Sequence, residues 1–309
     1  MKTAFVFPGQ GSQYVGMGKD LYDNFEEVRD IYKNVSDALG YDLADLSFNG
    51  PQDELNKTFR TQPCLLTASY SAFRVLLSKG VTPVCVAGHS LGEYSAIAAS
   101  GVISITEAVR LTENRGRFMQ DAVPEGRGLM AAVIGLDREA INKICSSVVS
   151  GYVAPANFNC PGQIVIAGER AAVEEAIKLA DKAGARRAVP LAVSVPSHCK
   201  LMESASNKLS GLLDGMELQR PEVPIVNNAD AAFLKDKDLI KDSLVRQLNS
   251  PLLWEDSIKA MLENGVDTFI EVGPKTVLTG LIKRIDRNVK LLNVEDTKSL
   301  AVTLTSLSV

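Results

Sequence analysis

The most informative segment for the fold is Val84-Cys85-Val86-Ala87-Gly88-His89-Ser90-Leu91-Gly92. The short apolar run at 84–87 predicts a buried strand, and the pattern over 93–100 predicts a helix directly after it. The residues between them, 88–92, have the pattern G-x-S-x-G. In this context the pattern indicates a nucleophile elbow, a sharp turn that exposes the serine hydroxyl. The alternative is a serine that caps the helix of an ordinary strand-to-helix turn.

Two similar apolar runs lie near the ends of the chain. Residues 3–7 stop at Pro8-Gly9, and residues 268–272 stop at Gly273-Pro274. Helical patterns lie between the runs, for example over 25–32. Strands that alternate with helices predict an α/β fold with a parallel sheet that is covered on both faces.

The stretch from 125 to 193 has a different rhythm. Strands are predicted at 128–134, 151–155, 163–167 and 187–191, and helices at 138–145 and 171–182, with an Asn-Cys-Pro-Gly turn at 159–162. This order, βαββαβ, is that of a ferredoxin-like unit. We therefore expect residues 125–193 to form a small subdomain inserted into a large domain made of residues 1–124 and 194–309.

The composition narrows the classes of function. The chain has 309 residues and a formal net charge of -4, which argues against bulk nucleic-acid binding. No apolar run is long enough to span a bilayer, and residues 1–7 are too short for a secretory signal. The five cysteines are never spaced C-x-x-C, and with only two histidines they give no metal-site signature. A reduced, cytoplasmic protein is expected.

A serine nucleophile needs a base, normally a histidine. The two candidates are His89 and His198. On a tight elbow the side chain of His89 should diverge from that of its neighbour Ser90. His198 follows the small subdomain, where the chain re-enters the large domain, and a groove between domains is a common place for a site. Elimination therefore favours His198, although the residues leave open what would orient it.

Two further segments could contact a substrate. The glycine-rich loop at 7–13 lacks the spacing of either phosphate-binding motif; it could instead bring a backbone N–H, or Gln10, to an oxyanion near Ser90. Arg115 and Arg117 lie two positions apart in a predicted helix and so point to different faces. One of them could face inward and pair with a substrate carboxylate. Plain structural roles are the alternative for both segments.

Taken together, these residues resemble the malonyl-CoA:acyl carrier protein transacylases of fatty acid synthesis. The resemblance runs nearly end to end and is carried by FPGQGSQ at 7–13, GHSLGEYSA at 88–96, RGRFMQ at 115–120, NFNCPGQIVIAG at 157–168, VPSHC at 195–199, VNNAD at 226–230, RQLNSPLLW at 246–254 and EVGPKTVLTGLIKRI at 271–285. It implies a hydrolase-like parallel-sheet core with an inserted ferredoxin-like subdomain.

The resemblance also implies roles for single residues. Ser90 matches the acylated serine, His198 its base, and Arg115 the arginine that holds the malonyl carboxylate. The others are Gln10 and Leu91 for the oxyanion hole, Gln247 for a backbone carbonyl that orients the histidine, and Asn157 and Asn159 for a loop that lines the cleft. The sequence departs from the family at Cys160, where many relatives have serine; we expect little consequence.

The implied activity is ping-pong transfer of malonyl from malonyl-CoA to the phosphopantetheine thiol of acyl carrier protein, which supplies fatty acid elongation. No cofactor or metal is expected. Because carrier proteins are acidic, a basic patch near the cleft is expected, with 186–187 and 283–284 as candidates. Two rival interpretations are a serine thioesterase or hydrolase, which shares the elbow, and a non-catalytic carrier-binding subunit.

Overall fold

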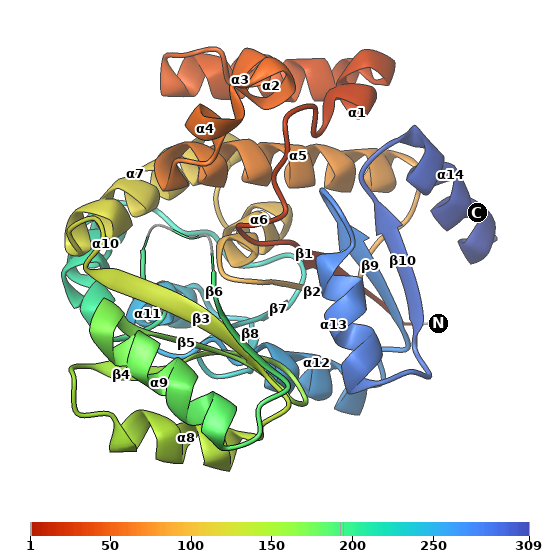
Figure 1. The fold of residues 1–309 in the computed structure, drawn as a ribbon. Helices are drawn as coiled ribbons and strands as arrows, with labels where there is room; N and C mark the ends of the chain where they lie inside the picture. Colours follow the sequence, from red (N-terminus) through yellow and green to blue (C-terminus); the bar gives the residue numbers. More distant parts are fainter. Residues whose placement is uncertain (1, 192, 194, 309) are drawn as a thin grey trace.

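The computed structural model describes residues 2–191, 193 and 195–308. At its centre is a six-stranded sheet with the order β10-β9-β1-β2-β7-β8 (Figure 1). The pairs from β10 to β7 are parallel, and β8 pairs antiparallel with β7. The strands are β1 (Thr3–Phe7), β2 (Cys85–Gly88), β7 (Ile225–Val226), β8 (Phe233–Leu234), β9 (Thr268–Val272) and β10 (Lys290–Val294). The predicted parallel-sheet core is confirmed.

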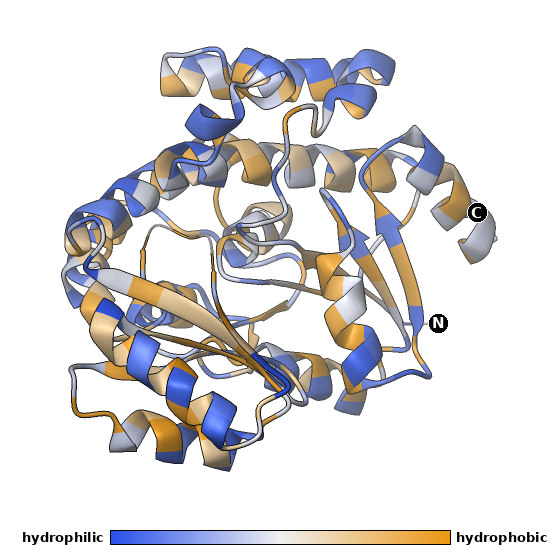
Figure 2. Ribbon diagram, in the orientation of Figure 1, coloured by the Kyte–Doolittle hydropathy of each residue, from blue (hydrophilic) through white to orange (hydrophobic). Residues whose placement is uncertain are grey.

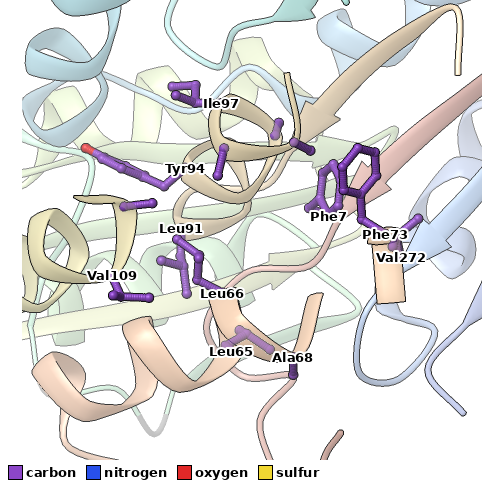
Figure 3. Packing of buried hydrophobic residues seen from close by; sticks show 14 of the residues in the cluster. Phe7, Leu65, Leu66, Ala68, Phe73, Leu91, Tyr94, Ile97, Val109 and Val272 are labelled. Carbon is purple, nitrogen blue, oxygen red and sulfur yellow. The ribbon is translucent and has the colours of Figure 1, made fainter. Parts of the chain in front are cut away.

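The central strands are buried on both faces, as in other parallel sheets. All five residues of β1 are buried. Phe5 and Phe7 face a large hydrophobic cluster, whereas Ala4 and Val6 face a smaller one on the opposite side of the sheet. Figure 3 shows Phe7 against Phe73 of helix α5 (Thr58–Ser78), and the ring centroids of the two residues are 6.2 Å apart. Because successive side chains of a strand point to opposite faces of the sheet, β1 contributes to the hydrophobic clusters on both of its faces.

Helices cover both faces of this sheet. Helices α5 to α7 contribute to the larger cluster, and α12 and α13 to the smaller one. None of the helices in the described ranges is long and apolar enough to cross a membrane. The helices before residue 123 and after residue 199 are α1 (Lys19–Asn24), α2 (Glu26–Leu39), α3 (Leu43–Asn49), α4 (Gln52–Leu55), α5 (Thr58–Ser78), α6 (Leu91–Ala99), α7 (Ile105–Ala122), η1 (Lys200–Met202), α10 (Glu203–Asp214), α11 (Lys237–Asn249), α12 (Trp254–Glu263), α13 (Val277–Ile285) and α14 (Thr297–Leu307).

A second, four-stranded antiparallel sheet has the order β4-β5-β3-β6. Its elements follow one another along the chain as β3 (Gly128–Ile134), α8 (Arg138–Ser147), β4 (Val153–Cys160), β5 (Gln163–Glu169), α9 (Arg170–Lys182) and β6 (Arg187–Pro190). Both helices pack on the sheet through one apolar cluster. The subdomain boundaries at 124/125 and 193/194 stay a prediction, and Ser194 lies outside the described residues.

Strand β4 differs from its prediction. It begins two residues later than expected and continues through the residues predicted as a turn, up to Cys160. Two contacts extend it: Phe158 packs into the apolar cluster of the small sheet, and its N–H donates to Leu252 O at 2.9 Å. The turn is thereby reduced to Pro161-Gly162. The change places Asn157 and Asn159 on a strand instead of a loop.

Candidate active site

Ser90 lies at the junction of β2 and α6 with φ 53° and ψ -106°, a conformation that is strained for a residue with a side chain. Two glycines make this turn possible. A Cβ on Gly88 would lie 1.8 Å from the carbonyl carbon of Gly92, and a Cβ on Gly92 would lie 2.0 Å from Phe7 O. The backbone therefore closes tightly around Ser90, which is the geometry of a nucleophile elbow.

His198 is buried beside the elbow and hydrogen-bonded on both sides of its ring. Nε2 lies 2.8 Å from Ser90 Oγ, and Nδ1 lies 2.7 Å from the backbone oxygen of Gln247, near the end of α11. A carbonyl oxygen can only accept, so Nδ1 carries the proton in the neutral ring and Nε2 offers its lone pair to the serine hydroxyl. The ring is thus oriented as a base toward Ser90.

The protonation state of His198 supports this arrangement. Burial, and then the nearby charge of Arg115, lower the pKa of His198 to about 3. Both effects disfavour the charged ring. At neutral pH the imidazole is therefore neutral and able to accept a proton.

Arg115 extends from α7 into the same site. Its guanidinium donates to Gln62 Oε1 at 2.8 Å, to Gln247 Oε1 at 3.0 Å and to Ser90 Oγ at 3.2 Å. The side chain is 1% exposed, and burial lowers its pKa. Arg117, by contrast, points outward and pairs with Glu113 at 3.1 Å. The two arginines diverge as the helical spacing predicts, and Arg115 is the inward one.

A second layer of side chains fixes the elbow, and two of its members, Glu93 and Asn228, had no role predicted from the sequence. Asn228 Oδ1 accepts from the N–H of Ser90 at 2.8 Å, and Gln247 Nε2 donates to Ser90 O at 3.0 Å. Behind both lies Glu93, whose Oε2 accepts from Gln247 Nε2 at 2.8 Å and from the Asn228 N–H at 3.0 Å. Burial raises the pKa of Glu93 to about 7. One buried carboxylate therefore links the residues that hold Ser90 in place.

These groups open onto a cavity of about 290 Å³ between the two sheets. Ser90, His198 and Arg115 line it together with Gln10 and Leu91. Leu91 is the first residue of α6, so its N–H belongs to the first-turn amides that have no partner within the helix. The side-chain amide of Gln10 donates to Thr58 Oγ1 over a long distance of 3.4 Å. The geometry thus places both predicted oxyanion-hole residues at the nucleophile.

The two predicted asparagines differ in their contacts. Asn159 Oδ1 lies 2.9 Å from Nε2 of His89, whose ring also packs edge-on against Trp254. His89 therefore turns away from Ser90, as expected for a residue next to the nucleophile. Asn157 also lines the cavity, and within the described residues its buried Oδ1 has no hydrogen-bond partner.

Comparisons with known proteins show the family to which the chain belongs. A family model described as an acyl transferase domain matches residues 4–303. The malonyl CoA-acyl carrier protein transacylase of Escherichia coli K12 is 53% identical over 284 residues, which cover 91% of this chain and 92% of the relative. The protein of the same name from Bacillus subtilis is 43% identical over 308 residues, covering 99% and 97%.

Solved structures give the same result. A malonyl-transacylase in complex with a holo type II polyketide acyl-carrier protein superposes with a TM-score of 0.97 at 49% identity, covering 99% of this chain and 100% of that one. An acyl carrier protein S-malonyltransferase from Vibrio cholerae superposes with a TM-score of 0.96 at 48% identity, covering 98% and 100%.

The architecture and these contacts are those of an α/β enzyme with a serine nucleophile on a strand–turn–helix elbow and a histidine as its partner. A similarity of this extent also shows the family. The chain belongs to the malonyl CoA-acyl carrier protein transacylases.

Proposed function

We propose that this protein transfers malonyl from malonyl-CoA to the phosphopantetheine thiol of acyl carrier protein through an ester on Ser90. The main observation behind the proposal is that Ser90, His198 and Arg115 line the same cavity. Ser90 Oγ lies 2.8 Å from the base His198 and 3.2 Å from Arg115, a cation suited to a carboxylate. A nucleophile, its base and a partner for the malonate group are what this reaction requires.

In the first half-reaction His198 Nε2 takes the proton of Ser90, whose Oγ attacks the thioester carbon. The oxyanion that forms is stabilised by backbone N–H groups, which we assign to Gln10 and Leu91; each such donor contributes about 3 kcal/mol. The C–S bond then breaks, and His198 returns the proton to the sulfur of coenzyme A. The steps balance without a metal or cofactor.

In the second half-reaction the thiol of acyl carrier protein attacks the malonyl ester, with His198 again moving the proton. The thiol is now the nucleophile and Ser90 the leaving group, and His198 passes the thiol proton to Ser90 Oγ as the ester C–O bond breaks. Because coenzyme A has left before the carrier thiol reacts, the kinetics are ping-pong. A carrier that delivers its thiol on a flexible arm needs an open cavity, which the site provides.

Arg115 links recognition to proton transfer. Its charge is the second cause of the low pKa of His198. A malonyl carboxylate bound to Arg115 neutralises that charge, and the pKa of His198 then rises. The substrate therefore strengthens the base that attacks it, whereas an acetyl group leaves the arginine charge in place.

Mass spectrometry of the intact protein tests the proposal. Mixing with malonyl-CoA should add one malonyl group to the wild type and none to Ser90→Ala. Holo acyl carrier protein should discharge the adduct much faster than water. Rapid discharge by water alone would instead support a thioesterase, and a wild type without any adduct would support a carrier-binding subunit. We further propose that the protein acts in the cytoplasm.

A further inference from the structure

Three loops meet at one edge of the central sheet, next to the cavity of Ser90. They follow β1, β9 and β10, which are parallel neighbours, so all three leave the sheet at its carboxyl edge (Figure 1). The loop after β1 carries Gln10, to which we assign an oxyanion donor. The loop after β9, residues 273–276, leads into α13, whose hydrophobic first residues Val277 and Leu278 line the cavity (Figure 2). Contacts between these loops can therefore act on the site.

Gly11 directly follows Gln10, and packing does not hold it in place. Its φ is 103°, and no atom of the described residues lies within 4 Å of the Cβ that a side chain would add. Hydrogen bonds hold both of its polar backbone groups instead. The N–H donates to Gln13 Oε1 at 2.7 Å, and the carbonyl oxygen accepts from Lys275 Nζ at 3.2 Å. The course of the backbone after Gln10 therefore depends on these two side chains.

Lys275 is itself held in a costly conformation. Its φ is 66°, in the left-handed region that residues other than glycine adopt only with strain. Its N–H donates to Glu295 Oε2 at 2.9 Å, and the same oxygen accepts from Tyr14 Oη at 3.1 Å. Glu295 thus ties Lys275 to the end of the loop after β1, and the Lys275 side chain reaches back to Gly11 in the middle of that loop. Strained residues that are fixed in this way cluster at functional sites.

We propose that Lys275 is a positioning residue for the oxyanion hole; this inference rests on the proposed function. Its ammonium group fixes Gly11 O, and the backbone of Gly11 continues that of Gln10. With this carbonyl fixed, the Gln10 N–H stays aimed at the place where the thioester oxygen becomes negative. A donor that is already aligned needs no reorganisation when the charge develops, which is how an oxyanion hole accelerates a reaction. Lys275 is exposed and acts through the backbone.

The strain at Lys275 provides a way to separate positioning from stability. Glycine adopts a φ of 66° without strain but has no side chain to reach Gly11. Methionine also lacks the ammonium group but keeps the strain and a stem of similar length. If Lys275 positions the loop, the reaction rate follows the ammonium group, whereas the unfolding temperature follows the strain.

The test compares Lys275→Gly, Lys275→Met and Lys275→Arg with the wild type. Rapid-mix mass spectrometry gives the rate of Ser90 malonylation as a function of malonyl-CoA concentration, and thermal unfolding gives Tm. Ser308→Gly is the matched control, because it removes another side chain at a positive φ, 60°, at the end of α14 and outside the three loops.

At saturating malonyl-CoA, Lys275→Gly and Lys275→Met should both react about five- to tenfold more slowly than the wild type, because a hydrogen bond from a charged group is lost. The half-saturating concentration should stay unchanged, because the oxyanion forms only on the way to the transition state. Lys275→Arg keeps a cation of similar reach and should recover most of the rate. Lys275→Gly should unfold about 1–3 °C above Lys275→Met, which keeps the strain. Ser308→Gly should react like the wild type.

Several results would overturn the inference. An unchanged maximal rate in Lys275→Met, or an equally slow Lys275→Arg, would show that the ammonium group does not position the loop. A change in the half-saturating concentration alone would make Lys275 an electrostatic contact for the substrate. A slow Lys275→Met beside a normal Lys275→Gly would assign the effect to backbone strain, and an equally slow Ser308→Gly would assign it to stability. A wild type that forms no malonyl adduct would refute the proposed function instead.

Discussion

Glu93 Oε2 accepts a hydrogen bond from Nε2 of Gln247 at 2.8 Å, and Gln247 in turn contacts both Ser90 and Arg115. The same Gln247 side chain donates to Ser90 O and accepts from Arg115, while its backbone oxygen accepts from His198. Glu93 touches no reacting atom, yet it fixes the residue through which all three functional side chains are positioned.

Glu93→Ala should therefore slow malonylation of Ser90 by about ten- to a hundredfold, because it leaves the buried donors of Gln247 and Asn228 unsatisfied. Glu93→Gln keeps a carbonyl oxygen at the same place and should stay within about threefold of the wild type. The rate of adduct formation in rapid-mix mass spectrometry measures both. Equal rates for Glu93→Ala and the wild type would show that the elbow holds its shape unaided.

Arg115→Ala should lower kcat/KM for malonyl-CoA by about a hundredfold or more, because the carboxylate loses a charged, bidentate partner in a buried site. Acetyl-CoA has no carboxylate, so its slow reaction should not fall. Arg115→Lys keeps the charge but cannot bridge Gln62 and Gln247, so an intermediate loss is expected. Parallel measurements with the two thioesters decide the matter: a loss of the same size for both would remove Arg115 from recognition.

The pH profile should show the low pKa of His198. Since burial and Arg115 hold that pKa at about 3, the free protein keeps a neutral base below pH 6.5, where an ordinary histidine becomes protonated. The acid limb of kcat/KM should therefore lie well below pH 6.5, and that of kcat higher, since bound malonyl neutralises Arg115. Glu93, with a pKa of about 7, titrates nearby, so the profile is also recorded in Glu93→Gln. An acid limb of kcat/KM near pH 6.5 in both proteins would contradict this electrostatic description.

Gly92→Ala should destabilise the fold by about 3 kcal/mol or more, because the new Cβ would lie 2.0 Å from a backbone oxygen in β1 that cannot move alone. Gly211→Ala is the control: nothing lies within 4 Å of the Cβ that alanine would add at this helical position, and the substitution should stabilise α10 by about 1 kcal/mol. Urea unfolding of the two variants compares the effects. A Gly92→Ala protein as stable as the wild type would mean that the elbow is looser than its geometry indicates.

The strands that the sequence predicted well are buried over all or most of their length. Residues 3–7, 128–134 and 268–272 became β1, β3 and β9 with the predicted bounds. Strand β10, at the edge of the sheet, was missed because its residues are mostly half-exposed, and β7 because two residues carry no readable pattern. Apolar runs reveal a strand only where both faces are covered.

For the site, residue type was informative only where a side chain does the chemistry. Ser90 could be read from its motif, and His198 by elimination among two histidines. Glu93 and Asn228 could not, because they act through contacts between segments more than a hundred residues apart. The carbonyl that faces His198 has no signature at all, since every residue has one.

That carbonyl has an evolutionary consequence. A histidine oriented by an aspartate loses its partner through a single codon change, and catalysis falls by orders of magnitude. Here the partner atom is present whichever amino acid is encoded at 247, as long as α11 keeps its course. A substitution at 247 can therefore remove this hydrogen bond to His198 only if it displaces the backbone of α11. This contact is accordingly more tolerant of mutation than a contact with an aspartate side chain.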